Sequence, residues 1–307
     1  MNYFLSCKTK EGYIYSCDKI CIVGKIAYEF IFDFGLDLDK FLWSSYLRGQ
    51  ADSSNRPWDY IEFGDYAQYL KFGYSEFRNN YTLKLSNGSS FWFGCYHNSD
   101  KGQKVSWKLE LNPNKCLPCD FVFEFLRFLH SRSSLSSFKM TQFDLAIDFP
   151  FARSSSYLEK DMRTHSIINS GDDNITEYLS KHNQHGFVKL YNKTKESNLK
   201  YDLTRLEITL KEFHVNDVLK VFPKVHIADN SQITFDDKLS DLSDNDKVFV
   251  ELLRFHPYYF DKLTYRKRQK FAPYVSFGSP LYELDVFTYE SLLKQIKKVF
   301  VECPMKE

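Results

Sequence analysis

The stretch GFVKLYNKTKESNLKYDLTRLEITLK, residues 186–211, decides the fold. Both of its ends, FVKLYN (187–192) and LTRLEITLK (203–211), alternate apolar and polar side chains, which is typical of strands with one buried face. A charged loop connects these two strands. A third run with the same alternation, FKMTQFDLAIDF (138–149), precedes them in the chain.

If these three strands are neighbours, one face of their sheet belongs to the core and the other face is polar. The strand at 105–111 could extend the same polar face. The alternation places the following side chains on it: Asp144, Asp148, Lys189, Tyr191, Lys193, Arg205 and Glu207, with Lys108 and Glu110 from strand 105–111.

This set of side chains has two interpretations. Clustered carboxylates repel one another unless a hard cation lies among them, and Mg²⁺ or Mn²⁺ accepts oxygen ligands. A metal beside lysines can bind a phosphodiester, and a tyrosine can attack phosphorus to hold a covalent phosphotyrosine. The alternative is an ordinary solvated sheet face, on which Glu207 simply pairs with Arg205 or a lysine across the strand.

The remaining chain indicates a mixed fold. Residues 1–111 are β-rich, and KICIVGKIAYEFIF (19–32) has strand composition with a helix as the alternative. Asn87-Gly88 predicts a hairpin turn within 80–96, and Asn112-Pro113-Asn114 predicts a further turn. Other segments are expected as follows: a helix over 120–131 capped by Asp120, a polar loop–helix mixture over 150–185, and helices over 245–256 and 288–300.

Composition excludes several classes of protein. The 307 residues are 18% aromatic and carry 41 Lys+Arg against 40 Asp+Glu, whereas a disordered chain has few aromatics and a larger net charge. No apolar run reaches the roughly 20 residues of a membrane-spanning helix, and the start, MNYFLSCKTKEGY, lacks the pattern of a secretory signal. Seven cysteines without a repeating frame then predict reduced thiols and a cytoplasmic location.

The near-zero net charge hides a segregation of charge in the C-terminal third. Residues 229–251 hold seven acidic residues against two basic, whereas 254–270 hold six basic residues against one acidic. The basic cluster suits contacts to DNA phosphates and guanine edges, and a solvated basic turn is its alternative. The residues of this candidate DNA-binding cluster are Tyr265, Arg266, Lys267, Arg268 and Lys270, with Phe255, Tyr258 and Tyr259 nearby as either base-stacking or core residues.

A cysteine pattern and a histidine pattern are weaker candidates for metal sites. Cys116 and Cys119 form a CxxC that would need Cys17 and Cys21 to complete a zinc site, and the latter two are spaced differently and lie far away in the sequence. His182 and His185 lack the glutamate of the metalloprotease motif, so they are interpreted as loop residues. No glycine-rich phosphate loop of the Walker type occurs, which argues against ATP hydrolysis.

The segments FDLAID (143–148), GFVKLYNKTKE (186–196) and TRLEITLK (204–211), in this order and spacing, resemble the Rep_trans family. KLELNPNK (108–115) also resembles a stretch of that family. Its members are replication initiators of Gram-positive rolling-circle plasmids, with relatives among transposon relaxases and a filamentous-phage replication protein. The likeness covers about residues 105–211.

The resemblance implies a protein that nicks one DNA strand at a plasmid origin through a 5′-phosphotyrosine. It implies a divalent metal, a homodimer and a host UvrD-like helicase as partner. Carried over by motif, Tyr191 is the expected nucleophile, and Tyr201 is the alternate. The expected metal ligands are Asp144, Asp148 and Glu207, with Glu110 and Glu196 behind them, and the expected phosphate contacts are Lys189, Lys193 and Arg205.

We therefore expect an α+β protein with a largely antiparallel, curved catalytic sheet and flanking helices. A nicking portion is predicted over 1–212, followed by a helical portion over 213–307 that recognises DNA and dimerises. The expected ligand is origin DNA, both as a double-stranded site and as an extruded single-stranded hairpin. Because no His-hydrophobic-His cluster occurs, the metal site is expected to consist of carboxylates. The alternatives are a conjugative relaxase on the same scaffold and a non-catalytic DNA-binding protein.

Overall fold

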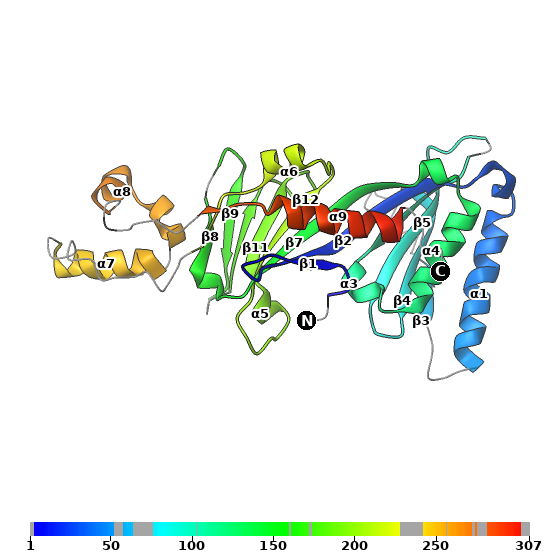
Figure 1. Ribbon diagram of the computed structural model, residues 1–307, viewed down its shortest axis with the longest axis horizontal. Coiled ribbons are helices and arrows are strands. Elements are labelled where there is room, and N and C mark those ends of the chain that lie inside the picture. The colour runs from blue at the N-terminus through cyan, green and yellow to red at the C-terminus, as the bar shows by residue number, and fades with distance from the viewer. Residues whose placement is uncertain are drawn as a thin grey trace. The chain divides into compact units, whose positions relative to one another are not determined.

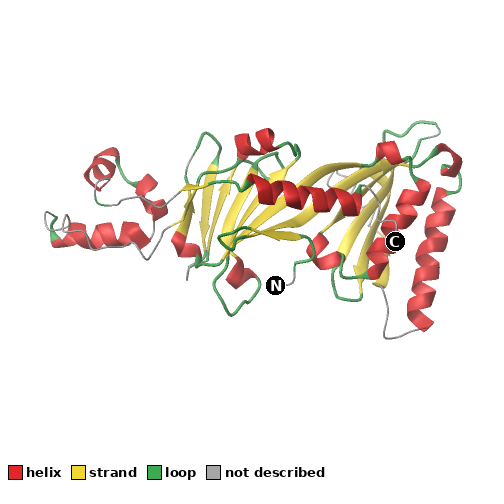
Figure 2. Cartoon of the chain, in the orientation of Figure 1, coloured by secondary structure: helices red, strands yellow, loops and turns green. Residues whose placement is uncertain are grey.

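The structure is a computed structural model, and it shows the predicted α+β class, with a large antiparallel sheet and flanking helices (Figures 1 and 2). The described residues are 3–51, 58–63, 76–102, 104–159, 161–171, 174–227, 242–255, 257–271, 274 and 281–301. They divide into two compact units. The first unit comprises Met1–Cys7, Ser16–Leu145 and Thr288–Glu307, and the second comprises Lys8–Tyr15 and Ala146–Phe287.

The strands of the sheet follow a different order in space from their order in the chain. The first unit contains the order β3-β4-β5-β6-β2-β7, with β1 paired to β2, and the second contains β7-β12-β11-β10-β9. Their bounds are Ser6–Lys8 (β1), Ile14–Lys25 (β2), Trp58–Phe63 (β3), Phe77–Leu85 (β4), Ser90–His97 (β5), Ser106–Leu111 (β6), Lys139–Phe149 (β7), His165–Asn169 (β9), Ile175–Leu179 (β10), Phe187–Asn192 (β11) and Thr204–Leu210 (β12).

The predicted hairpin at Asn87-Gly88 is confirmed as the β4–β5 turn. Gly88 has a φ of +79°, a left-handed conformation that favours glycine, and its amide donates to the Leu85 carbonyl at 2.9 Å. The Asn87 side-chain oxygen accepts from the Ser89 amide at 3.0 Å. The turn therefore fixes the register in which the two strands pair.

Phenylalanines build the core of the first unit between helices α1 (Phe34–Ala51) and α4 (Asp120–Arg132) and the sheet. Phe41 of α1 stacks on Phe128 of α4 at 4.7 Å between ring centroids, and Phe125 contacts Phe93 of β5 at 5.1 Å. The helix predicted over 120–131 is confirmed as α4, whose apolar stripe of Phe121, Phe125, Leu126 and Leu129 is buried. Its predicted cap is wrong: Cys119 is the N-cap residue, without a side-chain hydrogen bond, and Asp120 is the first helical residue.

The segment 150–185 differs from the loop–helix mixture expected for it. It holds η3 (Arg153–Ser155), β8 (Ser156–Leu158), β9 and β10. In β10, the fully buried Glu177 occupies a position where the strand pattern requires an apolar residue, and it pairs with Arg153 at 2.5 Å. Because a carboxylate interrupts the apolar alternation, the strand is hidden in the sequence.

The helices predicted over 245–256 and 288–300 are confirmed as α7 (Asp244–Phe255) and α9 (Val286–Phe300). Residues 213–307 also contain strands, because β13 (Val225–Ile227) pairs with β14 (Leu281–Tyr282) and β8 in a small second sheet. The predicted portions 1–212 and 213–307 were defined by expected function and have different bounds from the two compact units. The division of function between them stays a prediction.

The other described helical segments are short. Asn112 caps α3 (Pro113–Cys116), which replaces the predicted turn at residues 112–114, and η1 (Tyr28–Phe30) follows β2. The remaining bounds are Leu135–Ser137 (η2), Lys193–Glu196 (α5), Val215–Val221 (α6), Pro257–Lys262 (η6) and Tyr265–Phe271 (α8). Among the described residues, no helix combines the length and apolarity needed to cross a bilayer.

Candidate active site

The antiparallel pair β11–β12 in the second unit brings the predicted polar residues together. Tyr191 lies opposite Arg205, and Lys189 lies opposite Glu207. Residues that oppose each other across two strands project to the same face of the sheet. The polar face predicted from alternation is therefore present in these two strands.

Tyr191 is the centre of this face, and its hydroxyl has two polar neighbours. The hydroxyl donates to Glu207 Oε1 at 2.5 Å, and Lys193 Nζ donates to the same hydroxyl at 3.5 Å. The Lys189 ammonium lies 3.7 Å from the centroid of the Tyr191 ring. Tyr191 is thus held between a carboxylate at its oxygen and lysines at its ring and its oxygen.

The environment of Tyr191 keeps its phenol protonated. Burial raises the pKa of Tyr191 far above its ordinary value, and the Glu207 carboxylate raises it further. Arg205 acts in the opposite sense on this pKa without cancelling the rise. Nucleophilic use of this hydroxyl therefore needs a base in contact, and Glu207 occupies that position.

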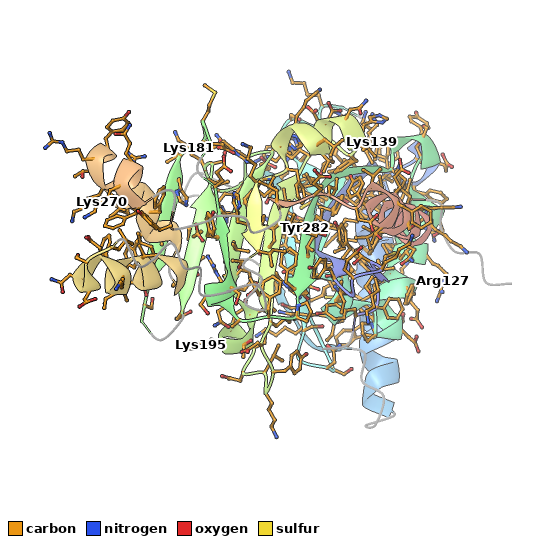
Figure 3. The ribbon with its side chains drawn as sticks, turned by 60° about the vertical axis from the view of Figure 1, so that its left-hand side comes forward. Arg127, Lys139, Lys181, Lys195, Lys270 and Tyr282 are labelled. Carbon is orange, nitrogen blue, oxygen red and sulfur yellow. The ribbon has the colours of Figure 1, made fainter. Side chains whose placement is uncertain are left out.

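The one-turn helix α5 supplies the lysine at the tyrosine oxygen. Asn192, the last residue of β11, caps this helix by accepting from the Lys195 amide at 3.0 Å. Lys193 is the first helical residue, and its ammonium also pairs with Glu196. Lys195 lies on the exposed side of this segment and is labelled in Figure 3.

Asp148 forms a buried ion pair with Arg205, which lies opposite Tyr191 in the sheet. Arg205 donates to both carboxylate oxygens of Asp148, from Nε at 2.6 Å and from Nη2 at 2.7 Å, and both side chains are almost fully buried. This bidentate geometry is the strong form of an arginine–carboxylate pair. Arg205 is therefore held as the partner of Asp148, on the same face of the sheet as Tyr191.

Tyr201, the alternate nucleophile, lies on the loop between α5 and β12 and is half exposed. Its backbone carbonyl accepts from the Thr194 hydroxyl at 2.9 Å, which ties the loop to α5. A substrate can reach this side chain more easily than it can reach Tyr191. The two tyrosines therefore differ in access.

Asp144 and Glu110 belong to the first unit, whereas the other candidates belong to the second. Glu110 pairs with Lys108 at 2.6 Å and with Lys19 at 3.0 Å. Burial raises the pKa of Glu110, but these lysines outweigh burial and hold it below its ordinary value. Asp144 accepts a hydrogen bond from Gln142 Nε2 at 3.2 Å.

The predicted carboxylate ligands do not gather into one metal-binding group. Among the described residues, no cluster of three or more His, Cys, Asp or Glu side chains is arranged to hold a metal ion. Asp148 is paired with Arg205, and Glu196 with Lys193. Glu207 accepts the Tyr191 hydroxyl. These residues do not fit a carboxylate-built metal centre, and the Mg²⁺ or Mn²⁺ requirement stays a prediction.

No family model and no curated protein matches this chain. A solved structure of a rolling-circle replication initiator protein from Geobacillus stearothermophilus matches with a TM-score of 0.37 and 12% identity, over 96% of this chain and 100% of that chain. That protein is a replication initiator.

The predicted DNA-binding cluster forms the exposed part of α8. Lys270, labelled in Figure 3, pairs with Asp246 of α7 at 2.7 Å, and the Lys267 ammonium lies 5.4 Å from the centroid of the Phe249 ring. Arg266 and Arg268 are exposed and form no ion pair with any residue that the structure describes. These two arginines are therefore accessible to a ligand, while Lys267 and Lys270 face α7.

The histidine and cysteine patterns do not form metal sites within the described chain. His182 contacts the Phe187 ring at 5.2 Å between centroids, and His185 Nδ1 accepts from the Lys211 amide at 3.1 Å. Cys116 is fully buried and donates to the Ser90 carbonyl at 3.4 Å. These contacts agree with loop histidines and a packed thiol.

The alternation missed the side chains that β10 adds to the polar face. Thr176 lies opposite Tyr191 and Tyr178 lies opposite Lys189, so both share the face of the candidate site. The Tyr178 ring stacks on Phe187 at 6.0 Å between centroids. The sequence did contain a signal for this strand. The alternate residues Ile175, Glu177 and Leu179 form a strand pattern if Glu177 is counted as buried.

Proposed function

We propose that this protein nicks and rejoins a DNA strand through Tyr191 and acts as an initiator of rolling-circle plasmid replication. One observation carries the proposal: the Tyr191 hydroxyl donates to Glu207 at 2.5 Å while the Lys193 ammonium lies 3.5 Å from the same oxygen. A nucleophile, a base and a cation at one atom are the groups that phosphoryl transfer to a tyrosine needs.

In the proposed step, one bond to phosphorus forms and another breaks. The Tyr191 oxygen attacks phosphorus and forms a P–O bond while its proton passes to Glu207. The bond between phosphorus and the 3′-oxygen breaks, and that oxygen takes up a proton to become a free 3′-hydroxyl. The 5′-phosphotyrosine keeps the energy of the broken bond, so attack by a 3′-hydroxyl in the reverse direction rejoins the strand.

The two lysines neutralise charge that develops on the phosphoryl oxygens. Lys193 is nearly fully buried beside the tyrosine oxygen, where an ammonium acts in a lower dielectric than water provides. Lys189 covers the Tyr191 ring and is partly exposed, so its flexible chain must swing aside when DNA enters. After this movement, the Lys189 ammonium can pair with the phosphate as a counter-ion.

The initiator role is proposed from the motifs and from the distribution of charge. The segments KLYNKTKE and RLEITLK resemble the Rep_trans family, and they supply Tyr191, Lys193 and Glu207. Arg266 and Arg268 on α8 provide an exposed basic surface for the double-stranded part of an origin. A homodimer and a host helicase complete the proposed assembly.

The decisive experiment incubates the full-length protein with a supercoiled plasmid that carries its cognate origin, in the presence of Mg²⁺. Tyr191→Phe is expected to abolish both the nicked circle and the covalent protein–DNA adduct, because it removes the oxygen that forms the bond. DNA binding is expected to stay within about threefold, since the ring and its packing remain. Gel electrophoresis with and without protease digestion measures nicking and adduct.

Tyr201→Phe is the matched control and is expected to nick at the wild-type rate. An active Tyr191→Phe together with an inactive Tyr201→Phe would move the nucleophile to Tyr201. Binding without nicking by the wild-type protein would instead support a non-catalytic DNA-binding protein. Nicking at a transfer origin and not at a replication origin would support a conjugative relaxase.

A divalent-ion requirement is a separate prediction, which rests on the family resemblance. EDTA is expected to stop nicking, and added Mg²⁺ or Mn²⁺ is expected to restore it. The same plasmid assay measures both effects. Nicking that continues at the original rate in EDTA would contradict the metal requirement without touching the role of Tyr191.

A further inference from the structure

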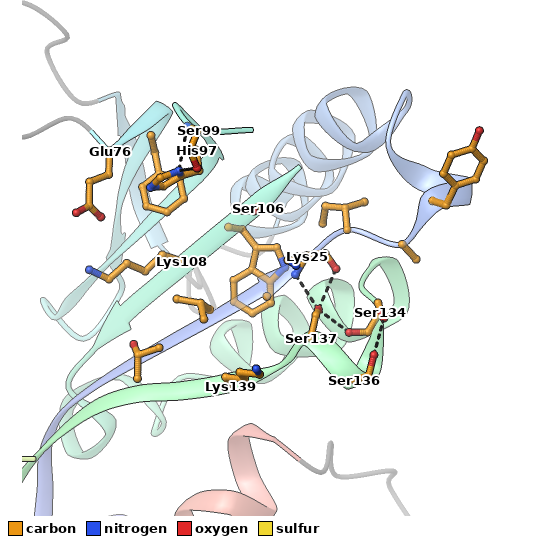
Figure 4. Close-up of a pocket in the computed structure, with 18 residues that line it drawn as sticks. Lys25, Glu76, His97, Ser99, Ser106, Lys108, Ser134, Ser136, Ser137 and Lys139 are labelled. Carbon is orange, nitrogen blue, oxygen red and sulfur yellow. Dashed lines mark hydrogen bonds between the residues drawn. The ribbon is translucent and has the colours of Figure 1, made fainter. Parts of the chain in front are cut away.

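A pocket of about 810 Å³ lies in the first unit, and its lining includes no residue of the Tyr191 site. Strands β2, β5, β6 and β7 and the serine-rich segment 134–137 form its walls (Figure 4). The proposed nicking step uses none of these residues. The pocket therefore needs an explanation of its own.

The charge of the pocket is positive. Lys25, Lys108 and Lys139 line it, and Glu76 is the carboxylate among the described lining residues. Lys108 is paired with Glu110, which lies outside the lining. Lys25 and Lys139 are exposed, and neither forms an ion pair with a residue that the structure describes. The pocket thus presents two ammonium groups that an anion can approach.

Serine hydroxyl groups also line the pocket. Ser137 Oγ accepts from the Lys25 amide at 2.8 Å, which holds the serine segment against the β2 end of the pocket. Ser134 Oγ and Ser136 Oγ lie 3.1 Å apart, and both line the pocket. Serine hydroxyls next to lysines are typical contacts of nucleic-acid phosphate and sugar oxygens.

The floor of the pocket is rigid and aromatic. A Cβ atom on Gly24 would lie 2.3 Å from the Trp107 ring, so the indole packs directly on the glycine backbone. Trp107 Nε1 also donates to Ser133 Oγ at 2.9 Å, which fixes the ring orientation. Tyr28, another lining residue, is 66% exposed and offers an aromatic face to a ligand.

We propose that this pocket binds the sugar–phosphate backbone of a single DNA strand, with Lys25 and Lys139 at phosphates and Tyr28 stacked on a base. Electropositive grooves with exposed aromatic rings are the general means of holding single strands without reading their sequence. The labelled lysines come from three different strands and lie at separate places around the pocket (Figure 4). That distribution fits successive phosphates along a strand better than the single phosphate group of a free nucleotide.

The choice of DNA rests on the proposed function, so the test must separate binding from nicking. Fluorescence anisotropy of a labelled 20-nucleotide oligo(dT) is measured with the full-length Tyr191→Phe protein. Lys25→Glu/Lys139→Glu is expected to weaken binding about tenfold or more. The slope of log K against log salt is expected to fall by about 1.4, because two phosphate contacts are lost from a single strand.

The matched control is Lys40→Glu/Lys101→Glu, which makes the same change of charge at two exposed lysines of the first unit outside the pocket. It is expected to change affinity less than threefold. Tyr28→Ala alone is also expected to weaken binding of the oligonucleotide. Tyr28→Phe keeps the stacking face and is expected to bind like the protein with Tyr28. These results would support binding of a single DNA strand in the pocket even if the plasmid assay showed no nicking.

Four outcomes overturn the proposal. Equal losses in the pocket and control variants would show that only net charge matters. Unchanged binding by the pocket variant would place the strand elsewhere. Displacement of the oligonucleotide by dTMP at the same phosphate concentration would make the pocket a mononucleotide site, and stronger binding of oligo(U) than oligo(dT) would make it an RNA site.

Discussion

At the scale of single residues, the pair Asp148–Arg205 places two opposite charges in the interior. Both side chains are almost fully buried, and the guanidinium donates to both carboxylate oxygens. Removing one partner leaves an uncompensated charge in the interior. We expect Asp148→Ala to reduce the free energy of unfolding by about 3–5 kcal/mol, measured by urea denaturation at neutral pH.

The double variant Asp148→Leu/Arg205→Met is the control for this prediction, because it removes both charges and fills a similar volume. We expect it to be more stable than Asp148→Ala, and the double-mutant cycle to show a coupling free energy above about 1 kcal/mol. A coupling free energy near zero would contradict the view that the two side chains act as one buried pair.

The same residues show how far alternation can predict a site. Alternation correctly placed Tyr191, Lys189, Arg205 and Glu207 on one face, because side-chain direction in a strand follows from position alone. It could not predict the partners of the charges. Whether Asp148 takes a metal or an arginine depends on the reach and burial of side chains on another strand, which the spacing of residues does not encode.

At the scale of elements, prediction succeeded where local chemistry and tertiary burial agree. The β4–β5 turn has a glycine where the backbone needs positive φ, and α4 has an unbroken apolar stripe. Prediction failed for β10, because Glu177 is buried through a partner 24 residues away in the sequence. A contact of that kind is invisible to a window of ten residues.

Two glycines test the backbone geometry of these elements. Gly88 and Gly186 have φ values of +79° and +75°, but the space around them differs. No atom lies within 4 Å of a Cβ on Gly88, whereas a Cβ on Gly186 would meet Val221 at 2.8 Å. We expect Gly88→Ala to cost about 1–2 kcal/mol of stability from strain alone.

Gly186→Ala is expected to cost more than Gly88→Ala by about 1–3 kcal/mol, because Val221 of α6 must also move. Thermal or urea unfolding of the two variants side by side measures the difference. Equal losses would show that α6 shifts freely and does not hold the start of β11.

At the scale of the whole molecule, the net charge of +1 is the sum of paired and segregated charges. In the candidate site, Glu196 is paired with Lys193 and Asp148 with Arg205, and in the first unit Glu110 is paired with Lys19 and Lys108. Part of the acidic run at 229–251 lies outside the described residues. A chain of nearly neutral charge can therefore carry local basic surfaces at α8 and at the serine-rich pocket, while its weak overall field limits non-specific DNA binding.

The stability of the whole chain is expected to fall as the pH rises above about 9. Burial raises the pKa of the Cys21 thiol from 9.0 to about 12 and that of Tyr15 from 10.0 to about 12, and it raises the pKa of Cys95 as well. In the unfolded chain these groups lose their protons near their ordinary pKa values, while the folded chain keeps them. Folding is favoured fully below those values, and the advantage is lost as the pH rises.

Urea midpoints measured at pH 8, 9 and 10 under reducing conditions test this expectation. Each such thiol lowers the free energy of unfolding by about 1.4 kcal/mol per pH unit above its unfolded pKa. Cys21→Ala should be less stable than the wild type at pH 8, because a buried side chain is truncated. Its free energy of unfolding should then fall less steeply with pH, because one titrating group has been removed. The cavity left by Cys21→Ala lowers stability equally at every pH, so the slope of the free energy of unfolding against pH reports the ionisation of the thiol alone. A variant that keeps the wild-type slope would show that the Cys21 thiol ionises equally well in the folded chain.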